Sequence, residues 1–135
     1  MGPGRVERMT AKGGVPAKGA YSQAVAAGGF VFVSGQGPKD PATGKSVEGG
    51  IAGQTRQALR NISSILGEAG LGLSDVVKAN VYLKDIRDFR AFDAAYAEAF
   101  GDALPARTTV QAVLPSPDIL VEIDVVAKGK GRGRR

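Results

Sequence analysis

The chain has 135 residues, which suits one domain with a single modest core. It contains no cysteine and no histidine, so disulfides, thiol nucleophiles, a Ser-His-Asp triad and the usual zinc sites are excluded. We expect neither a metal nor a cofactor, and a proton carrier would have to be Asp, Glu, Lys, Tyr or water. The formal net charge is +5, and its placement along the chain is uneven.

Basic residues gather at the C-terminus. The tail from Lys128 to Arg135 holds five of the 18 basic residues and no acid. The other 13 basic residues equal the 13 acidic ones, so residues 1–127 are formally neutral. Because the tail interleaves glycine with charge, we expect residues 128–135 to be disordered. It is the one segment suited to nucleic acid, as a hook for polyanions, and the alternative is a solubilising end.

The first 16 residues are rich in glycine, proline and charge, so we expect a loose arm with room for one short edge strand. They lack the apolar segment of a signal peptide, and no apolar run in the chain approaches the ~20 residues of a membrane span. We therefore expect a cytoplasmic protein that does not enter a membrane, with a single domain at residues 17–127.

Two strands are predicted after the arm, at residues 20–26 and 30–34. Gly28 and Gly29 separate them and favour a tight turn, so the strands should form a hairpin. Residues 30–33 read Phe-Val-Phe-Val, and a strand that is apolar on both faces is expected to be buried on both sides. The glycines of the following loop, residues 34–38, let another backbone approach closely.

Two helices are predicted on either side of a third strand at residues 77–83. The first helix covers residues 51–69, and the second begins after a capping Asp85 and ends near Phe100. Each carries an apolar stripe at helical spacing, which we expect to be core rather than ligand contacts. The stripes are Ala58, Ile62, Ile65, Leu66 and Ala69, and then Phe89, Phe92, Ala95, Tyr96, Ala99 and Phe100.

The segment 105–127 predicts two more strands, at residues 108–114 and 119–127, separated by prolines. If they pair as a hairpin, Arg107 and Glu122 fall at the same end of it. A guanidinium can hold a carboxylate through two parallel hydrogen bonds, and a nearby carboxylate can position a water. Two alternatives stay open, because the two charges could form a structural ion pair, or Glu122 could face solvent.

The element order is β-β-α-β-α-β-β, which predicts an α+β fold with a mixed sheet and two helices packed on one face. Residues 30–33, 81–83 and 121–126 carry apolar side chains on both faces of their strands. No further segment is available to cover the second face. We therefore expect self-association through it, with any site at that interface shared between subunits.

Five motifs occur in a specific order along this chain. They are Tyr-Ser-Gln-Ala at 21–24, Val-Ser-Gly-Gln at 33–36, Tyr-Leu-Lys-Asp at 82–85, Pro-Ala-Arg at 105–107, and Val-Glu-Ile at 121–123. Each is weak alone, but together the chain resembles the RidA (YjgF) family of enamine/imine deaminases over about residues 15–127. Some members of that family are described as endoribonucleases or translation initiation inhibitors.

The resemblance implies a chorismate-mutase-like fold and a homotrimer with sites in the clefts between subunits. It also implies hydrolysis of 2-imino acids, such as 2-iminobutanoate and 2-iminopropanoate, to 2-oxo acids and ammonia. Arg107 matches the arginine that binds the substrate carboxylate, and Glu122 matches the acidic residue that holds the attacking water. Tyr21 matches a tyrosine that lines the cleft, and Ser34 and Gly35 match its Ser-Gly-Gln loop. Tyr21 as plain interface packing and Ser34 as a turn cap remain open.

Two positions of the implied substrate site depart from the family pattern. Thr109 stands where well-known members have cysteine, and a hydroxyl can also donate a hydrogen bond. Arg87 stands where they have asparagine, and this second cation could extend the range of acidic ligands or face solvent. Two other functions stay open: a binding protein for 2-oxo acids without turnover, and an RNA-directed role as endoribonuclease or translation inhibitor.

Overall fold

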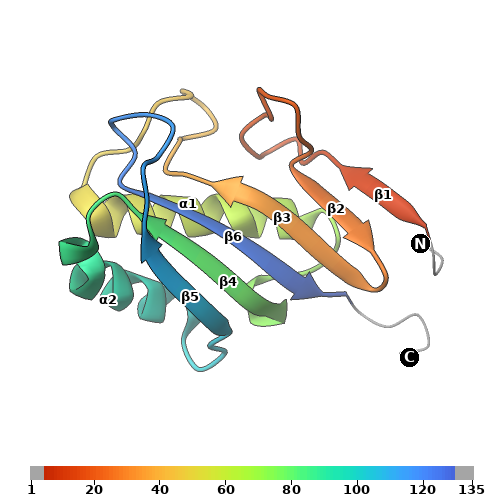
Figure 1. Cartoon of the computed structure of the whole chain (residues 1–135). Coiled ribbons are helices and arrows are strands. Elements are labelled where there is room, and N and C mark those ends of the chain that lie inside the picture. Colours follow the sequence, from red (N-terminus) through yellow and green to blue (C-terminus); the bar gives the residue numbers. More distant parts are fainter. Residues whose placement is uncertain (1–4, 130–135) are drawn as a thin grey trace.

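The computed structural model describes residues 5–129. Six strands form one sheet in the order β1-β2-β3-β6-β4-β5, and both helices lie on the same face of it (Figure 1). The predicted α+β class is therefore confirmed. The elements are β1 (Val6–Met9), β2 (Ala24–Ala27), β3 (Phe30–Gln36), α1 (Gly50–Gly67), β4 (Val76–Leu83), α2 (Phe89–Phe100), β5 (Ala106–Gln111) and β6 (Val121–Lys128).

The predicted hairpin at the start of the domain is formed by β2 and β3. Gly28 and Gly29 have φ values of 60° and 84°, which glycine adopts without the strain of a side chain. Ala27 and Phe30 face each other across this turn. The strand β1 pairs antiparallel with β2 and forms one edge of the sheet, so the short edge strand expected within the N-terminal arm is present.

The second predicted hairpin is wrong, because β5 and β6 do not pair. The strand β4 lies between them, parallel to β5 and antiparallel to β6. The crossover through α2 places β5 beside β4, and the chain then returns so that β6 pairs with both β3 and β4. The loop with Pro115 and Pro117 therefore spans the width of a strand instead of closing a tight turn.

The core lies between the sheet and the helices. In β6 every second residue from Val121 to Ala127 is at most 1% exposed, and these side chains pack with Ile62, Ile65 and Phe92 of the helices. Two predicted core positions are exposed instead. Ala69 lies beyond the end of α1, and Ala99 lies in the last turn of α2, where the neighbouring Phe100 makes the core contact.

The face of the sheet opposite the helices is left uncovered by residues 5–129 (Figure 1). The sequence predicted apolar side chains on this face at residues 30–33, 81–83 and 121–126, but the face is apolar only in part. Phe32 of β3 is 46% exposed there, but β4 and β6 place Tyr82, Glu122 and Asp124 on the same face. The open face therefore combines apolar and polar regions.

The C-terminal tail begins at the end of the sheet. Lys128 is the last residue of β6, so it belongs to a strand and not to a disordered tail. The rest of the predicted tail, residues 130–135, and residues 1–4 of the arm lie outside the described part of the chain. Within residues 5–129, no helix has both the length and the hydropathy that crossing a membrane requires.

Candidate functional site

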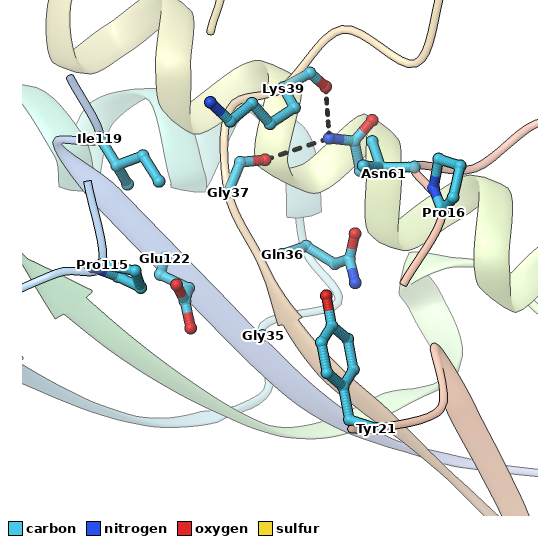
Figure 2. Close-up of a pocket in the computed structure, with 11 residues that line it drawn as sticks. Pro16, Tyr21, Gly35, Gln36, Gly37, Lys39, Asn61, Pro115, Ile119 and Glu122 are labelled. Carbon is cyan, nitrogen blue, oxygen red and sulfur yellow. Dashed lines mark hydrogen bonds between the residues drawn. The ribbon is translucent and has the colours of Figure 1, made fainter. Parts of the chain in front are cut away.

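A pocket of about 190 Å³ opens where the C-terminal end of β3 meets the start of β6. Three of the predicted site residues, Tyr21, Gly35 and Glu122, line it together, and Figure 2 shows Gly35 between the tyrosine and the glutamate. A pocket of this size is smaller than the roughly 300–1,000 Å³ of sites for drug-sized ligands, so it suits a small molecule. We call it the Glu122 pocket. The residues that line it are Val15, Pro16, Tyr21, Gly35, Gln36, Gly37, Lys39, Asn61, Pro115, Ile119 and Glu122.

The carboxylate of Glu122 is the acidic group that lines this pocket. It is half-buried, and within residues 5–129 no side chain or backbone group donates a hydrogen bond to it. Burial raises the pKa of Glu122, and the nearby negative charge of Asp124 raises it further. A half-buried carboxylate with raised proton affinity is suited to accept a proton from water.

Gly35 makes room for that carboxylate. A Cβ at this position would overlap Oε2 of Glu122 and lie 2.9 Å from its Cδ. The strand register also shifts between Val33 and Gln36, which marks an irregularity at this point of β3. Any side chain at position 35 would therefore require the Glu122 carboxylate to move.

Ser34 does not line the pocket. Its hydroxyl donates to the carbonyl of Ser22 at 2.6 Å, and its backbone N–H donates to the carbonyl of Gln23 at 2.9 Å. These bonds connect β3 to the segment that precedes β2 and carries Tyr21. Within the described residues Ser34 therefore fastens the segment that carries Tyr21 to β3, by contacts across the hairpin and not by capping a turn.

A hydrogen-bonded cluster lies beside Glu122 on the open face. Asp124 accepts from Asn80 Nδ2 and from the Tyr82 hydroxyl, each at 2.9 Å. Tyr82 is the cross-strand neighbour of Glu122. The hydrogen bond to Asp124 raises the pKa of Tyr82, with burial adding to it. The cluster holds the Asp124 carboxylate in place two residues from Glu122.

Polar side chains of α1 fasten the loops that form the pocket walls. The buried Asn61 donates to the carbonyls of Gly37 and Lys39, at 3.0 and 2.8 Å (Figure 2). Gln54 donates to the carbonyl of Asp118 and accepts from the N–H of Leu120. Sequence reasoning missed both residues, although an asparagine and a glutamine among the apolar positions of an amphipathic helix were a visible signal.

The loop before β6 is joined to the loop after β3 through Asp118. This carboxylate accepts hydrogen bonds from Ser46 and Ser116, and Lys39 Nζ lies 3.5 Å from it. The two hydroxyls, with a smaller effect from Lys39, lower the pKa of Asp118 well below its ordinary range. Lys39, the one cation that lines the pocket, therefore already has a carboxylate partner.

Arg107 lies on the other face of the sheet from Glu122. It stands opposite the buried Ala79 of β4 and points toward α2, where its Nη1 donates to Asp93 Oδ1 at 2.8 Å. Its Cζ lies 5.4, 5.2 and 4.7 Å from the ring centres of Phe89, Phe92 and Tyr96. These four α2 residues and Arg107 form the Arg107 cluster. The structural ion pair with Glu122, one of the alternatives left open, is therefore wrong.

Thr109 and Arg87 also lie outside the pocket. Thr109 follows Arg107 on the same face of β5, and its buried hydroxyl has no partner within the described residues. The Arg87 side chain is 88% exposed, and its Nη2 lies 2.7 Å from Asp85. This arginine lowers the pKa of Asp85 to about 2. Within one chain Arg87 faces solvent.

The described part of one chain thus brings together a small pocket, a carboxylate with a raised pKa and a tyrosine side chain, with no arginine among the lining residues. Within residues 5–129 no cluster of three or more acidic side chains is placed to bind a metal ion. The arrangement can polarise a water beside a small bound molecule. Within residues 5–129, Lys39 is the cation that lines the pocket, and Arg107 lies on the opposite face of the sheet.

Comparisons with known proteins agree with this architecture. The family model described as Endoribonuclease L-PSP matches residues 13–128. A RutC family protein of Pyrococcus horikoshii is 50% identical over 109 residues, covering 81% of this chain and 86% of the relative. The 2-iminobutanoate/2-iminopropanoate deaminase of Capra hircus is 41% identical over 123 residues and 90% of each chain. The structure of E. coli TdcF with bound serine has a TM-score of 0.85 at 31% identity, covering 92% of this chain and 99% of that one.

Proposed function

The chain belongs to the RidA (YjgF) family, which is also described as Endoribonuclease L-PSP, and we propose that it hydrolyses 2-imino acids to 2-oxo acids and ammonia. The observation that carries this proposal is the Glu122 carboxylate, half-buried and unpaired within the described residues, in a pocket of about 190 Å³. The Capra hircus relative is named for this reaction on 2-iminobutanoate and 2-iminopropanoate, and TdcF binds serine, which is also a small 2-substituted acid.

The reaction needs one water and one proton carrier. Glu122 accepts a proton as the water oxygen bonds to the carbon of the C=N group and passes it to the nitrogen, which gives a carbinolamine. Glu122 then takes the hydroxyl proton of the carbinolamine and gives it to the amine, so that the C–N bond breaks and ammonia and the 2-oxo acid leave. Because the imine carbon is already electrophilic, orientation and one general base are sufficient help.

The substrate carboxylate needs a cation. Lys39 lines the pocket, but it is held by Asp118, and its ammonium is a point charge. Arg107 offers a planar fork that fits a carboxylate, but β4 separates its strand from that of Glu122. We infer that Arg107 and Thr109 of a partner subunit complete the pocket.

A homotrimer with its sites between subunits would provide this arrangement. The exposed side chains of Phe32 and Val110, both on the open face of the sheet, favour self-association there. A small imino or oxo acid would then lie between the Glu122 pocket of one copy and the Arg107 cluster of the next.

The description of the family as an endoribonuclease supports an RNA-directed function as the second candidate. The pocket is small for a nucleotide, and residues 1–127 are formally neutral, so affinity for RNA would have to come from the basic tail. Removal of residues 128–135 should then abolish RNA binding without changing imine hydrolysis.

An ammonia-release assay tests the proposed reaction. A threonine dehydratase or an amino-acid oxidase generates the imino acid in situ, and the protein should accelerate its loss. Arg107→Ala should remove that acceleration, whereas Arg56→Ala should keep it. Arg56 is a matched control because it also pairs with an α2 carboxylate, Glu98, but away from the Arg107 cluster. No acceleration by the wild-type protein would contradict the proposed reaction.

A further inference from the structure

The guanidinium of Arg107 is held in a defined orientation. The rings of Phe89, Phe92 and Tyr96 lie along one side of α2, and all three are within 5.4 Å of its Cζ. Asp93, on the same helix, accepts from Nη1 at 2.8 Å. Only 20% of the arginine side chain is exposed, less than for the cation of any other ion pair within residues 5–129. Such stacking and pairing fix both the plane of the fork and its rotation within that plane.

One edge of the fork is left for a ligand. A guanidinium has five N–H donors, and within residues 5–129 Asp93 is the only acceptor bonded to those of Arg107. The rings of Phe89, Phe92 and Tyr96 lie near its Cζ and accept no hydrogen bond from it, and the Tyr96 hydroxyl has no partner within the described residues. With Nη1 bound by Asp93, the Nε–Nη2 edge can still give two parallel hydrogen bonds to a carboxylate.

Two more polar groups, one on a ring beside Arg107 and one two residues along β5, lack a partner within the described residues. The hydroxyl of Tyr96, whose ring contacts the guanidinium, is buried and unpaired within the described residues, and so is that of Thr109 on β5. Burial raises the pKa of Tyr96 to about 12, so the hydroxyl remains a donor at neutral pH. Buried hydroxyls without partners are uncommon and indicate a place where a ligand or water is bound.

We propose that Asp93 is a positioning residue and sets the affinity of the carboxylate site: it turns the Nε–Nη2 edge of Arg107 toward the substrate and offsets part of the arginine charge. This inference rests on the proposed function, in which Arg107 binds the substrate carboxylate. Asp93 itself does not contact the substrate. Partial neutralisation weakens the hold on the carboxylate, so that a 2-oxo acid product can leave.

The competing explanation is that Asp93 only tethers α2 to the sheet edge. The helix does not need that tether, because Phe92, Tyr96 and Phe100 already anchor it in the core, each at most 6% exposed. A tether would also give stability without any effect on ligand affinity. The two explanations therefore differ in what they predict for binding.

Two substitutions separate charge from hydrogen bonding. Asp93→Asn keeps an acceptor for Nη1 but removes the charge, so 2-oxobutanoate should bind about three- to tenfold tighter by calorimetry. Asp93→Ala removes the acceptor and frees the fork to rotate, so the hydrolysis rate should fall by about tenfold or more. Glu98→Gln changes the other α2 carboxylate that pairs with an arginine and should alter neither quantity.

The outcomes distinguish this inference from the proposed function. If both Asp93 variants lose thermal stability but keep wild-type affinity and rate, Asp93 is only a tether and the inference is overturned while the deaminase stands. If the wild type binds 2-oxobutanoate with the stated Asp93 dependence but hydrolyses no imine, the inference stands and the deaminase fails. A wild-type protein that does neither would overturn both.

Discussion

The Glu122 pocket and the Arg107 cluster lie on opposite faces of one sheet and differ in how their charges are treated. Glu122 is half-buried without a partner within the described residues, and its pKa is raised. Arg107 is stacked on three rings and paired with Asp93 at 2.8 Å. The first region keeps a reactive group unsatisfied, whereas the second holds a binding group in a fixed orientation. Under the proposed function the carboxylate exchanges protons and the cation only binds, and the two groups lie in environments that suit these opposite requirements.

Glu122→Gln should show the largest effect on activity. The amide cannot accept a proton from water, so the rate should fall by roughly 100- to 10,000-fold, while 2-oxobutanoate still binds. The assay is ammonia release beside calorimetry. A variant that keeps wild-type activity would exclude Glu122 as the base.

The same substitution, Glu122→Gln, should maintain or increase stability at pH 7, although it lowers activity. Because the pKa of Glu122 is raised in the folded state, its charged form is disfavoured there, and this cost is present above the folded pKa and disappears as the pH falls below the unfolded value. Glu122→Gln should therefore be at least as stable as wild type at pH 7, with the difference lost in acid. Thermal unfolding at several pH values measures it.

Gly35→Ala tests whether the pocket depends on close contact. The added Cβ would overlap the Glu122 carboxylate and force it to move, whereas the backbone at position 35 accepts alanine without strain. A displacement of this kind should cost about a hundredfold in rate. Gly67→Ala is a control, because a Cβ there meets nothing within 4 Å. Equal activity of the two variants would show that the position of Glu122 is not critical.

Asp124→Asn should produce a smaller effect, visible in the pH profile. Burial remains as the first cause of the raised pKa of Glu122, but the repulsion from Asp124 is removed. The acid limb of the rate should therefore move to lower pH, because Glu122 then loses its proton earlier. The other polar or charged side chains that line the pocket, Tyr21, Gln36, Lys39 and Asn61, are unchanged. An acid limb that stays in place would show that Asp124 does not act on Glu122.

Arg87→Ala should have the smallest effect. The side chain is 88% exposed and its fork is already paired with Asp85, so activity should stay within about twofold of wild type. A large loss would instead place Arg87 in the site through a partner subunit. The ammonia assay with several imino acids distinguishes these results.

Local patterns in the sequence were sufficient for most elements of the fold. The stripe around Ile62 and Ile65 predicted α1, and the glycines at 28 and 29 predicted the turn between β2 and β3. Strand pairing was less predictable. The prolines at 115 and 117 resemble a hairpin turn, but the partner of β6 is decided by the crossover through α2, which no local motif records.

The candidate site was predictable in part. The motifs indicated Tyr21, Gly35 and Glu122, which share the pocket, but they could not indicate that Arg107 lies on the other face. The face to which Arg107 points depends on the register between β5 and β4, and a shift of one residue would place its side chain on the opposite face. The sequence did not indicate Asp93, because its proposed role depends on its contact with the Arg107 guanidinium, fourteen residues away along the chain.

Mixing two inactive variants tests most directly whether the site is shared between subunits. Arg107→Ala chains retain Glu122, and Glu122→Gln chains retain Arg107, so they are unfolded together in equal amounts and refolded. If each site takes its two charges from different copies, random assembly should restore about a quarter of wild-type activity. If both charges come from the same chain, no mixed assembly contains an intact site, and activity should stay at the level of the separate variants. That result would contradict the shared site.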